Sequence, residues 1–245
     1  VEQARKLVEN GYREVVLTGV DATSYGADLP GNPTLGLLAK TLLKQVPEIL
    51  RLRLSSIDSI EADSHLFDLI ADDPRFMPHL HLSLQHGDDM ILKRMKRRHL
   101  RADAVELVAR LKALRPDIAV GADLIAGFPT ENEAHHAANL AIIDDLDIVH
   151  AHIFPYSPRP GTPAARMPQV PRNVVKTRAA ALRARAAARR AVWLDSLVGE
   201  TLPVLAERDG TGYAPNYARV ALPPGTAAGR IIDVTVREVR EGLLG

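Results

Sequence analysis

The stretch HLHLSLQHG, residues 79–87, has the pattern of a strand with two chemically different faces. Successive side chains of a strand point to opposite sides of a sheet. The leucines therefore share one face, and the other face carries His79, His81, Ser83 and Gln85. In a sheet wrapped by helices, the leucines should pack on the helices, which leaves the polar residues toward the interior.

Similar apolar runs recur along the chain at the spacing of a βα unit. Strands are predicted over 14–20, 50–56, 79–85, 118–126 and 147–154. Helices are predicted between them over 34–46, 61–71, 88–95 with 101–114, and 131–145. Repeated βα units form a parallel sheet with right-handed crossovers. The expected fold class is therefore α/β, a (β/α) barrel or open part-barrel, with a doubly wound open sheet as the alternative.

The repeats end at PRPGTPAARMPQVP, residues 158–171, which contains five prolines. An Ala/Arg-rich helix follows, and short strands with turn residues begin near Gly199. We therefore expect a partial barrel over 1–170, a basic helix over 171–197 that closes the barrel or links it onward, and a small β-domain over 198–245. A unit of that size has few residues with which to build its own core.

Composition narrows the function classes. Of the 245 residues, 46% are hydrophobic and 25% are charged, as in ordinary globular proteins. No apolar run approaches the roughly 20 residues that span a bilayer, so no membrane association is expected. The absence of cysteine excludes disulfides, thiol catalysis and any cysteine-ligated zinc or iron–sulfur site within these residues. Since the chain opens at Val1 directly in a helical pattern, we expect a piece of a longer protein whose N-terminus lies upstream.

Positive charge is concentrated in two segments that contain no acid. Residues 93–101 hold six Lys/Arg, and residues 172–190 hold seven. The remainder therefore carries 31 − 13 = 18 basic residues against 30 acidic ones, although the whole chain has a net charge of only +1. This asymmetry suggests a polyanionic partner, and two solvated helix faces are the alternative.

Several predicted strands place polar side chains on their inner face. These are Arg51, Arg53 and Ser55, then Asp123, then His150 and His152. Burying such groups together costs free energy unless they bind each other, water or a ligand, and we favour a ligand over a structural polar network. The two H-x-H pairs could indicate a metal-dependent hydrolase. They begin well before the C-terminal strand ends, where barrel chemistry occurs, so no metal ligand is predicted.

Five segments of this sequence resemble the radical S-adenosylmethionine methylthiotransferases. The matching strings are LTGVDATSYG, RLRLSSID, HLHLSLQHGDDMILKRMKRRH, GADLIAGFPTE and FPYSPRPGTPAARMPQV, in the family's order and spacing. They are most similar to the branch that methylthiolates threonylcarbamoyladenosine in tRNA. The C-terminal pattern GYAPNYARV…GRIIDVTV resembles the family's RNA-binding TRAM domain.

The resemblance implies S-adenosylmethionine as cofactor and, in full-length members, two four-iron–four-sulfur clusters. The implied cofactor-binding residues are Thr18, Gly19, Asp21, Ser55, Ser56, Gln85, Asp123, Ile125 and Gly127. The resemblance also implies that Tyr156, Ser157, Arg159 and Thr162 border the substrate. Positive charge then predicts phosphate contacts for Lys96, Arg97, Arg98, Arg183, Arg185, Arg189 and Arg190. The resemblance implies no catalytic residue in this chain, because the cysteines that bind the clusters are missing.

The implied partner is a tRNA anticodon stem-loop, the sulfur and electron donors are unidentified, and a cytoplasmic monomer is expected. Because thiolates hold the iron of such clusters, these 245 residues are expected to be inactive alone. Two other hypotheses stay open: a non-catalytic RNA-binding remnant, and an unrelated metal-dependent barrel hydrolase that uses the histidines.

Overall fold

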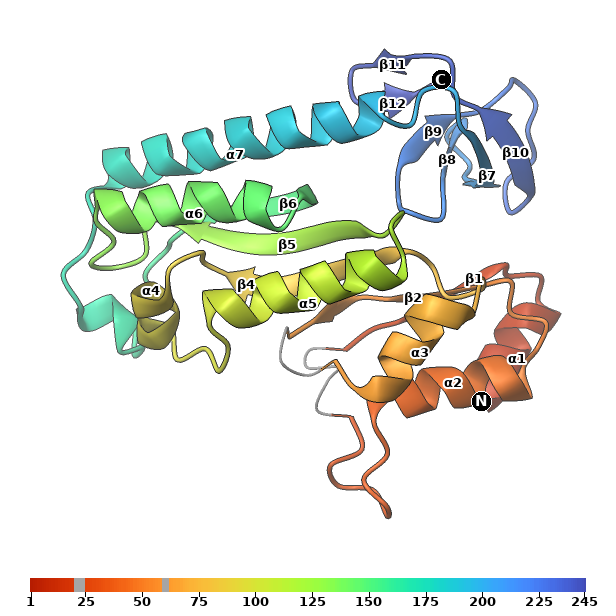
Figure 1. Ribbon diagram of the computed structural model, residues 1–245, viewed down its shortest axis with the longest axis horizontal. Helices are drawn as coiled ribbons and strands as arrows, with labels where there is room; N and C mark the ends of the chain where they lie inside the picture. Colours follow the sequence, from red (N-terminus) through yellow and green to blue (C-terminus); the bar gives the residue numbers. More distant parts are fainter. Residues whose placement is uncertain (20–24, 59–61) are drawn as a thin grey trace.

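The computed structural model describes residues 1–19, 25–58 and 62–245 (Figure 1). Its parallel strands are β1 (Glu14–Leu17), β2 (Arg51–Leu54), β3 (Ser56–Ile57), β4 (His79–Gln85), β5 (Ala119–Ala126) and β6 (Ile148–Pro155). A strand occurs at each of the five predicted positions, and the second is divided at Ser55. The α/β class with parallel sheets is confirmed.

The parallel strands form an open arrangement. One sheet has the order β1-β2 and the other the order β3-β4-β5-β6. A bridge between Leu52 and Phe76 continues the pairing beside β2, and the Ser55 amide donates to Leu17 O at 2.9 Å. Within the described residues, β1 pairs only with β2 and β6 only with β5. The chain therefore forms a part-barrel, and the described residues contain no closing strand pair.

Helices cover the apolar side of these strands. Their bounds are α1 (Glu2–Glu9), α2 (Leu35–Gln45), α3 (Ser64–Asp72), α4 (Asp89–Arg94), α5 (Arg101–Leu114) and α6 (Glu133–Asp145). Helix α6 begins two residues later than predicted because Asn132 is its N-cap, accepting the His135 amide at 2.9 Å.

The leucine face of β4 lies in the core, as predicted from the alternation. Leu80, Leu82 and Leu84 have no solvent exposure, and they belong to one apolar cluster with residues of α2, α3, α5 and α6. The polar residues of the same strand therefore face the opposite, concave side of the sheet. This division places His79, His81 and Gln85 where a ligand or another part of the chain can reach them.

Helix α7 (Arg172–Asp195) runs beside α6 and along β6 (Figure 1). With 24 residues it is about 36 Å long. It extends from one end of the parallel strands to the other. Arg178 lies near the turn after β5, and Arg190 contacts Val149 and His150 at the start of β6.

A six-stranded sheet follows α7. Its strands are β7 (Thr201–Ala206), β8 (Thr211–Tyr213), β9 (Arg219–Ala221), β10 (Ile231–Thr235), β11 (Val239–Arg240) and β12 (Leu243–Leu244). They pair in the order β10-β7-β8-β9-β12-β11, antiparallel except between β9 and β12. Leu194 of α7 belongs to this sheet's own small core, with Val204 and Val220. The division into three independent units stays a prediction, because α7 contributes to both cores.

The C-terminal sheet docks on the concave face where the parallel strands begin. Arg51 donates to Tyr213 O at 3.0 Å and to Pro203 O at 2.5 Å. Arg53 forms a two-point ion pair with Glu14 and also donates to Pro215 O at 3.0 Å. These arginine side chains are almost fully buried, so the carbonyl groups and Glu14 satisfy charges that would otherwise be costly to bury. No helix in the described residues is both long and apolar enough to cross a membrane.

Candidate functional site

A cavity of about 370 Å³ opens where the parallel strands end. It brings together two residues expected to bind cofactor and three expected to bind substrate. Its lining residues are Gln85, Arg94, Met95, Lys96, Arg97, Ile125, Phe128, Thr162, Pro163 and Ala164. The cavity is apolar at Ile125 and Phe128 and basic at Lys96 and Arg97, which suits a ligand with a flat apolar part and an anionic part.

The backbone at this edge of the sheet adopts left-handed conformations. Gln85 has a φ of 70° and Gly127 a φ of 71°. At Gly127 any side chain would also meet Val175 of α7, because a Cβ there would lie 2.6 Å from Val175 Cγ2. The strained turn at Gln85 ends β4 and places its side chain at the cavity.

A buried ion-pair network fixes the turn that follows β5. Glu131 Oε2 accepts the Gly127 amide at 3.0 Å and pairs with His86 Nε2 at 3.1 Å. Arg178 of α7 donates to Glu131 Oε1 at 3.0 Å. Burial raises the pKa of the Glu131 carboxyl, but His86, Arg178 and the Gly127 amide together hold that pKa below its ordinary value. His86, the residue after Gln85, is therefore a member of this network.

The basic segment after α4 curves back toward the cavity. Arg97 Nη2 donates to Ser83 O at 2.6 Å and to Asp58 at 3.0 Å, which holds its guanidinium beside β4. Lys96 is exposed and has a φ of 60°. Arg98 is also exposed, at the outer side of the same segment. The chain thus presents Lys96 and Arg97 at the cavity rather than carrying them outward along α4.

The hydroxyl of Tyr156 is buried and has no hydrogen-bond partner within the described residues. Tyr156 follows β6, and its ring meets Phe128 edge-on, with centroids 5.3 Å apart. An unpaired buried hydroxyl costs roughly 1–3 kcal/mol. Tyr156 does not itself line the cavity, but its ring contacts Phe128, which does.

The other residues expected to bind the cofactor do not line this cavity. Thr18 and Gly19 are exposed just after β1, and Ser55 and Ser56 are half-buried around the break between β2 and β3. Asp21 falls outside the described residues.

The other residues expected to bind substrate lie beyond β6 and on α7. Ser157 and Arg159 are exposed, and Thr162 Oγ1 donates to Arg159 O at 2.8 Å. Arg185 and Arg189 pair with Asp144 and Asp147, which lie at and just beyond the end of α6.

The remaining two arginines of this set bond to β6 rather than to acids. Arg183 donates to Ile153 O at 3.3 Å and Arg190 to Val149 O at 3.2 Å. Acids of another segment therefore neutralise two of these α7 arginines, and the other two bind carbonyl groups of β6.

Halfway along the concave face, Asp123 bonds to two histidines. His81 Nε2 lies 3.0 Å and His152 Nδ1 3.2 Å from Asp123 Oδ1. Burial raises the pKa of the Asp123 carboxyl, but hydrogen bonds from His81 and His152 keep it below its ordinary value. Asp123 is thus an ionised acceptor below the cavity, not part of its lining.

Below this cluster, the first members of both H-x-H pairs are neutral. Burial lowers the pKa of His79 to about 2 and that of His150 to about 3, with positive neighbours contributing. Both rings contact Tyr217 of the C-terminal sheet. The sequence pattern identified the polar face but not its division into a docked lower part, a middle cluster and an upper cavity.

Residues 1–141 match the Radical SAM superfamily. The chain belongs to the radical SAM superfamily. The threonylcarbamoyladenosine tRNA methylthiotransferase MtaB of Rickettsia prowazekii is 46% identical over 244 residues, which is 100% of this chain and 58% of the relative. MtaB of Thermotoga maritima is 36% identical over 246 residues, 98% of this chain and 56% of the relative.

Another curated relative is named for a different modified nucleoside. The tRNA-2-methylthio-N(6)-dimethylallyladenosine synthase of Erythrobacter litoralis is 36% identical over 248 residues, 97% of this chain and 55% of the relative. This radical SAM chain therefore spans somewhat more than half the length of these curated relatives. Among solved structures, the radical S-adenosylmethionine methyltransferase TsrM of Kitasatospora setae superposes with a TM-score of 0.52 at 17% identity, over 67% of this chain and 31% of TsrM. That likeness shows the part-barrel fold.

Radical SAM proteins use S-adenosylmethionine and an iron–sulfur cluster. The cavity, with apolar Ile125 and Phe128 beside the polar side chain of Gln85, fits a nucleoside-sized cofactor. A cluster does not fit these residues, because thiolates bind its iron and the 245 residues contain no cysteine.

Proposed function

We propose that this radical SAM chain is the cofactor-binding and RNA-facing part of a tRNA methylthiotransferase that acts on threonylcarbamoyladenosine beside the anticodon. The cavity that brings Gln85 and Ile125 together with Lys96, Arg97 and Thr162 carries the proposal. It joins an apolar surface for an adenosine moiety to basic side chains for an RNA phosphate. The identity to the MtaB relatives over almost the whole chain supports this branch.

Within this proposal, each part of the chain has one task. Ile125 and Phe128 would contact the adenine, and Gln85 would hydrogen-bond the ribose or the amino-acid part of S-adenosylmethionine. Lys96 would position an RNA phosphate at the cavity mouth, beside the Arg97 guanidinium that Asp58 and Ser83 O hold in place. The C-terminal sheet would act as a TRAM-like RNA-binding unit, held by its dock on the concave face. S-adenosylmethionine would supply the methyl group, and the radical step requires cluster ligands that these residues do not provide.

Calorimetric titration of the chain with S-adenosylmethionine tests the cavity. Ile125→Trp should abolish binding because the indole would occupy the space proposed for the adenine, while Leu37→Trp makes the same enlargement on α2 outside the cavity. Equal binding by both variants would place the cofactor elsewhere.

A second measurement tests whether these residues alone can bind an iron–sulfur cluster and cleave S-adenosylmethionine. After reconstitution with iron and sulfide, the chain alone should show no cluster absorbance and release no 5′-deoxyadenosine. The appearance of both would contradict the assignment of cluster binding to residues outside this chain.

A further inference from the structure

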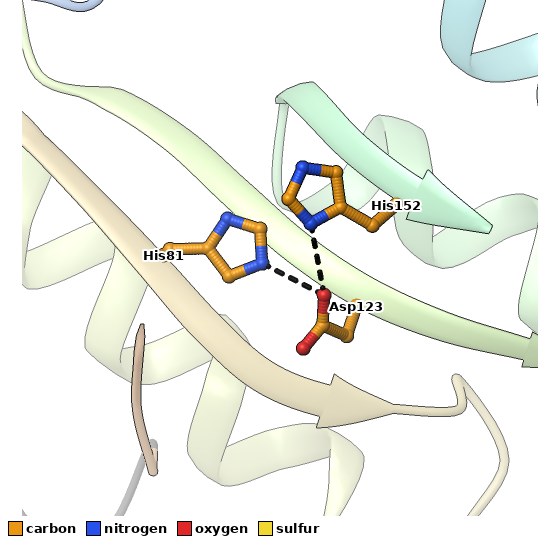
Figure 2. Close-up of side chains that lie close together, drawn as sticks. All are labelled: His81, Asp123 and His152. Atoms are coloured by element: carbon orange, nitrogen blue, oxygen red, sulfur yellow. Dashed lines mark hydrogen bonds and ion pairs between the residues drawn. The ribbon is translucent and has the colours of Figure 1, made fainter. Parts of the chain in front are cut away.

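Three side chains from neighbouring strands converge on the concave face, below the cavity. Figure 2 shows His81 on β4, Asp123 on β5 and His152 on β6 with their polar atoms pointing toward one another. Asp123 and His152 are direct partners in the β5–β6 register, and His81 pairs with Gly121, two residues before Asp123. The parallel sheet therefore places all three on one face.

Two of the separations between these polar atoms suit a single metal ion. Both imidazoles approach the same carboxylate oxygen, at 3.0 Å from His81 Nε2 and 3.2 Å from His152 Nδ1. Ligand atoms bound at about 2.0–2.1 Å to one ion lie roughly 2.8–3.4 Å apart in octahedral or tetrahedral geometry. One ligand atom from each of the three residues can be chosen so that all lie within 4.8 Å of one another.

Exposure is graded across the cluster. The His81 side chain is 8% exposed, Asp123 is 23% exposed and His152 is 63% exposed. Two ligands are thus held firmly by the sheet, and the third lies at the solvent edge of β6. An ion would enter from the His152 side, and water could complete its coordination from there.

Gly121 leaves the space that the His81 ring occupies. A Cβ at position 121 would lie 2.4 Å from His81 Nδ1, closer than any real contact. The absence of a side chain at this position on β5 therefore lets the His81 ring point across the sheet toward Asp123. This feature is separate from the hydrogen bonds within the cluster.

We propose that His81, Asp123 and His152 form a binding site for one divalent transition-metal ion, with Zn²⁺ as the representative ion. Two imidazoles and one carboxylate, without a thiolate, suit zinc and its neighbours in the first transition series. With three protein ligands, water occupies the remaining coordination positions. The ion would fasten β4, β5 and β6 together below the cavity.

The two H-x-H pairs alone do not predict this site. Each pair places its histidines about 6.5–7 Å apart along one strand, whereas the ligands come from three strands. The third ligand, Asp123, becomes apparent only from the register of β5 against its neighbours.

The test uses tag-free protein that has been stripped with a chelator and dialysed. Calorimetric titration with Zn²⁺ should give one site, and titration with Co²⁺ should give a visible d–d absorption band of similar stoichiometry. His152→Ala and Asp123→Asn should each weaken Zn²⁺ binding at least tenfold. Because His152 is exposed and asparagine keeps the shape of Asp123, circular dichroism should show both variants folded.

His135→Ala is the matched control, because His135 lies on α6 outside the cluster and caps its own helix. It should keep the parental zinc affinity and stoichiometry. Absence of zinc binding by the parent would overturn the proposal, since the cluster would then be a hydrogen-bond network only. Equal affinity in the parent, His152→Ala and Asp123→Asn would also overturn it, because the ion would be bound elsewhere.

Discussion

His79 of β4 stacks on Tyr217 of the C-terminal sheet, with ring centroids 4.9 Å apart and planes inclined by 30°. Tyr217 also stacks on Tyr213 at 4.8 Å and lies under the Arg53 guanidinium at 4.6 Å. One side chain thus contacts β2, β4 and its own sheet. Tyr217 holds this position with a φ of 68°, a conformation that the surrounding contacts must stabilise.

Removal of the Tyr217 ring should loosen the dock between the two sheets. Tyr217→Ala should lower the free energy of unfolding by about 1–3 kcal/mol, because the residue is only 37% exposed and its stacking on His79 and Tyr213 is lost. The only tryptophan, Trp193, contacts His150 beside the dock, so its fluorescence reports the separation.

Two controls separate docking from a general effect of tyrosine loss. Tyr217→Phe keeps the stacked ring and should remain within about 0.5 kcal/mol of the parent. Tyr12→Ala removes an exposed tyrosine and should behave in the same way. A Tyr217→Ala variant with the parental urea midpoint would mean that the dock does not depend on this ring.

Removal of the Tyr156 hydroxyl, unlike removal of the Tyr217 ring, should not lower the free energy of unfolding. Since this buried group has no partner within the described residues, Tyr156→Phe should leave the free energy of unfolding unchanged or raise it by up to about 1 kcal/mol. If S-adenosylmethionine bonds to the hydroxyl, the same variant should bind it about tenfold more weakly, as loss of one hydrogen bond predicts. Urea denaturation and calorimetry measure the two effects separately, and a destabilised Tyr156→Phe would show that the hydroxyl has a structural partner.

Local sequence pattern predicted the elements well and their long-range contacts poorly. The alternation in residues 79–85 correctly placed the leucines in the core. It could not show that Arg51 bonds to Tyr213, because these residues lie 162 positions apart. Likewise, the acid-free run of α7 suggested a free basic surface, yet Arg185 pairs with Asp144, which is 41 positions upstream. Charge along a segment does not reveal which acids tertiary packing brings to it.

Glu131 should make stability depend on pH in the acid range. Its pKa in the folded chain lies below the ordinary value of 4.5, because ion pairs with His86 and Arg178 outweigh the effect of burial. The unfolded chain therefore takes up a proton at higher pH than the folded chain does. The stabilisation is complete above about pH 4.5 and is lost as the pH falls through the lowered pKa.

Glu131→Gln tests this sign, since glutamine cannot ionise. It should cost about 3 kcal/mol at pH 7, where Arg178 loses its buried partner. The difference in free energy of unfolding between parent and variant should shrink between pH 6 and pH 3. Glu133→Gln is the control: Glu133 pairs with the same arginine but its side chain is 85% exposed, so the change should stay below about 1 kcal/mol. Parallel pH curves for the parent and Glu131→Gln would refute the assignment.

RNA binding should depend more on Lys96 than on the paired arginines of α7. Lys96 lies at the cavity mouth and is exposed, whereas Arg185 already pairs with Asp144. With an anticodon stem-loop, the slope of log affinity against log salt should fall by about 1 for Lys96→Gln, as expected for one lost phosphate contact. For Arg185→Gln the slope should fall by less than half as much. Because Asp144 already neutralises the Arg185 side chain, RNA binding would release few counterions from it. Fluorescence anisotropy over a series of KCl concentrations measures both slopes. A larger effect from Arg185 would move the RNA from the cavity mouth to the face of α7.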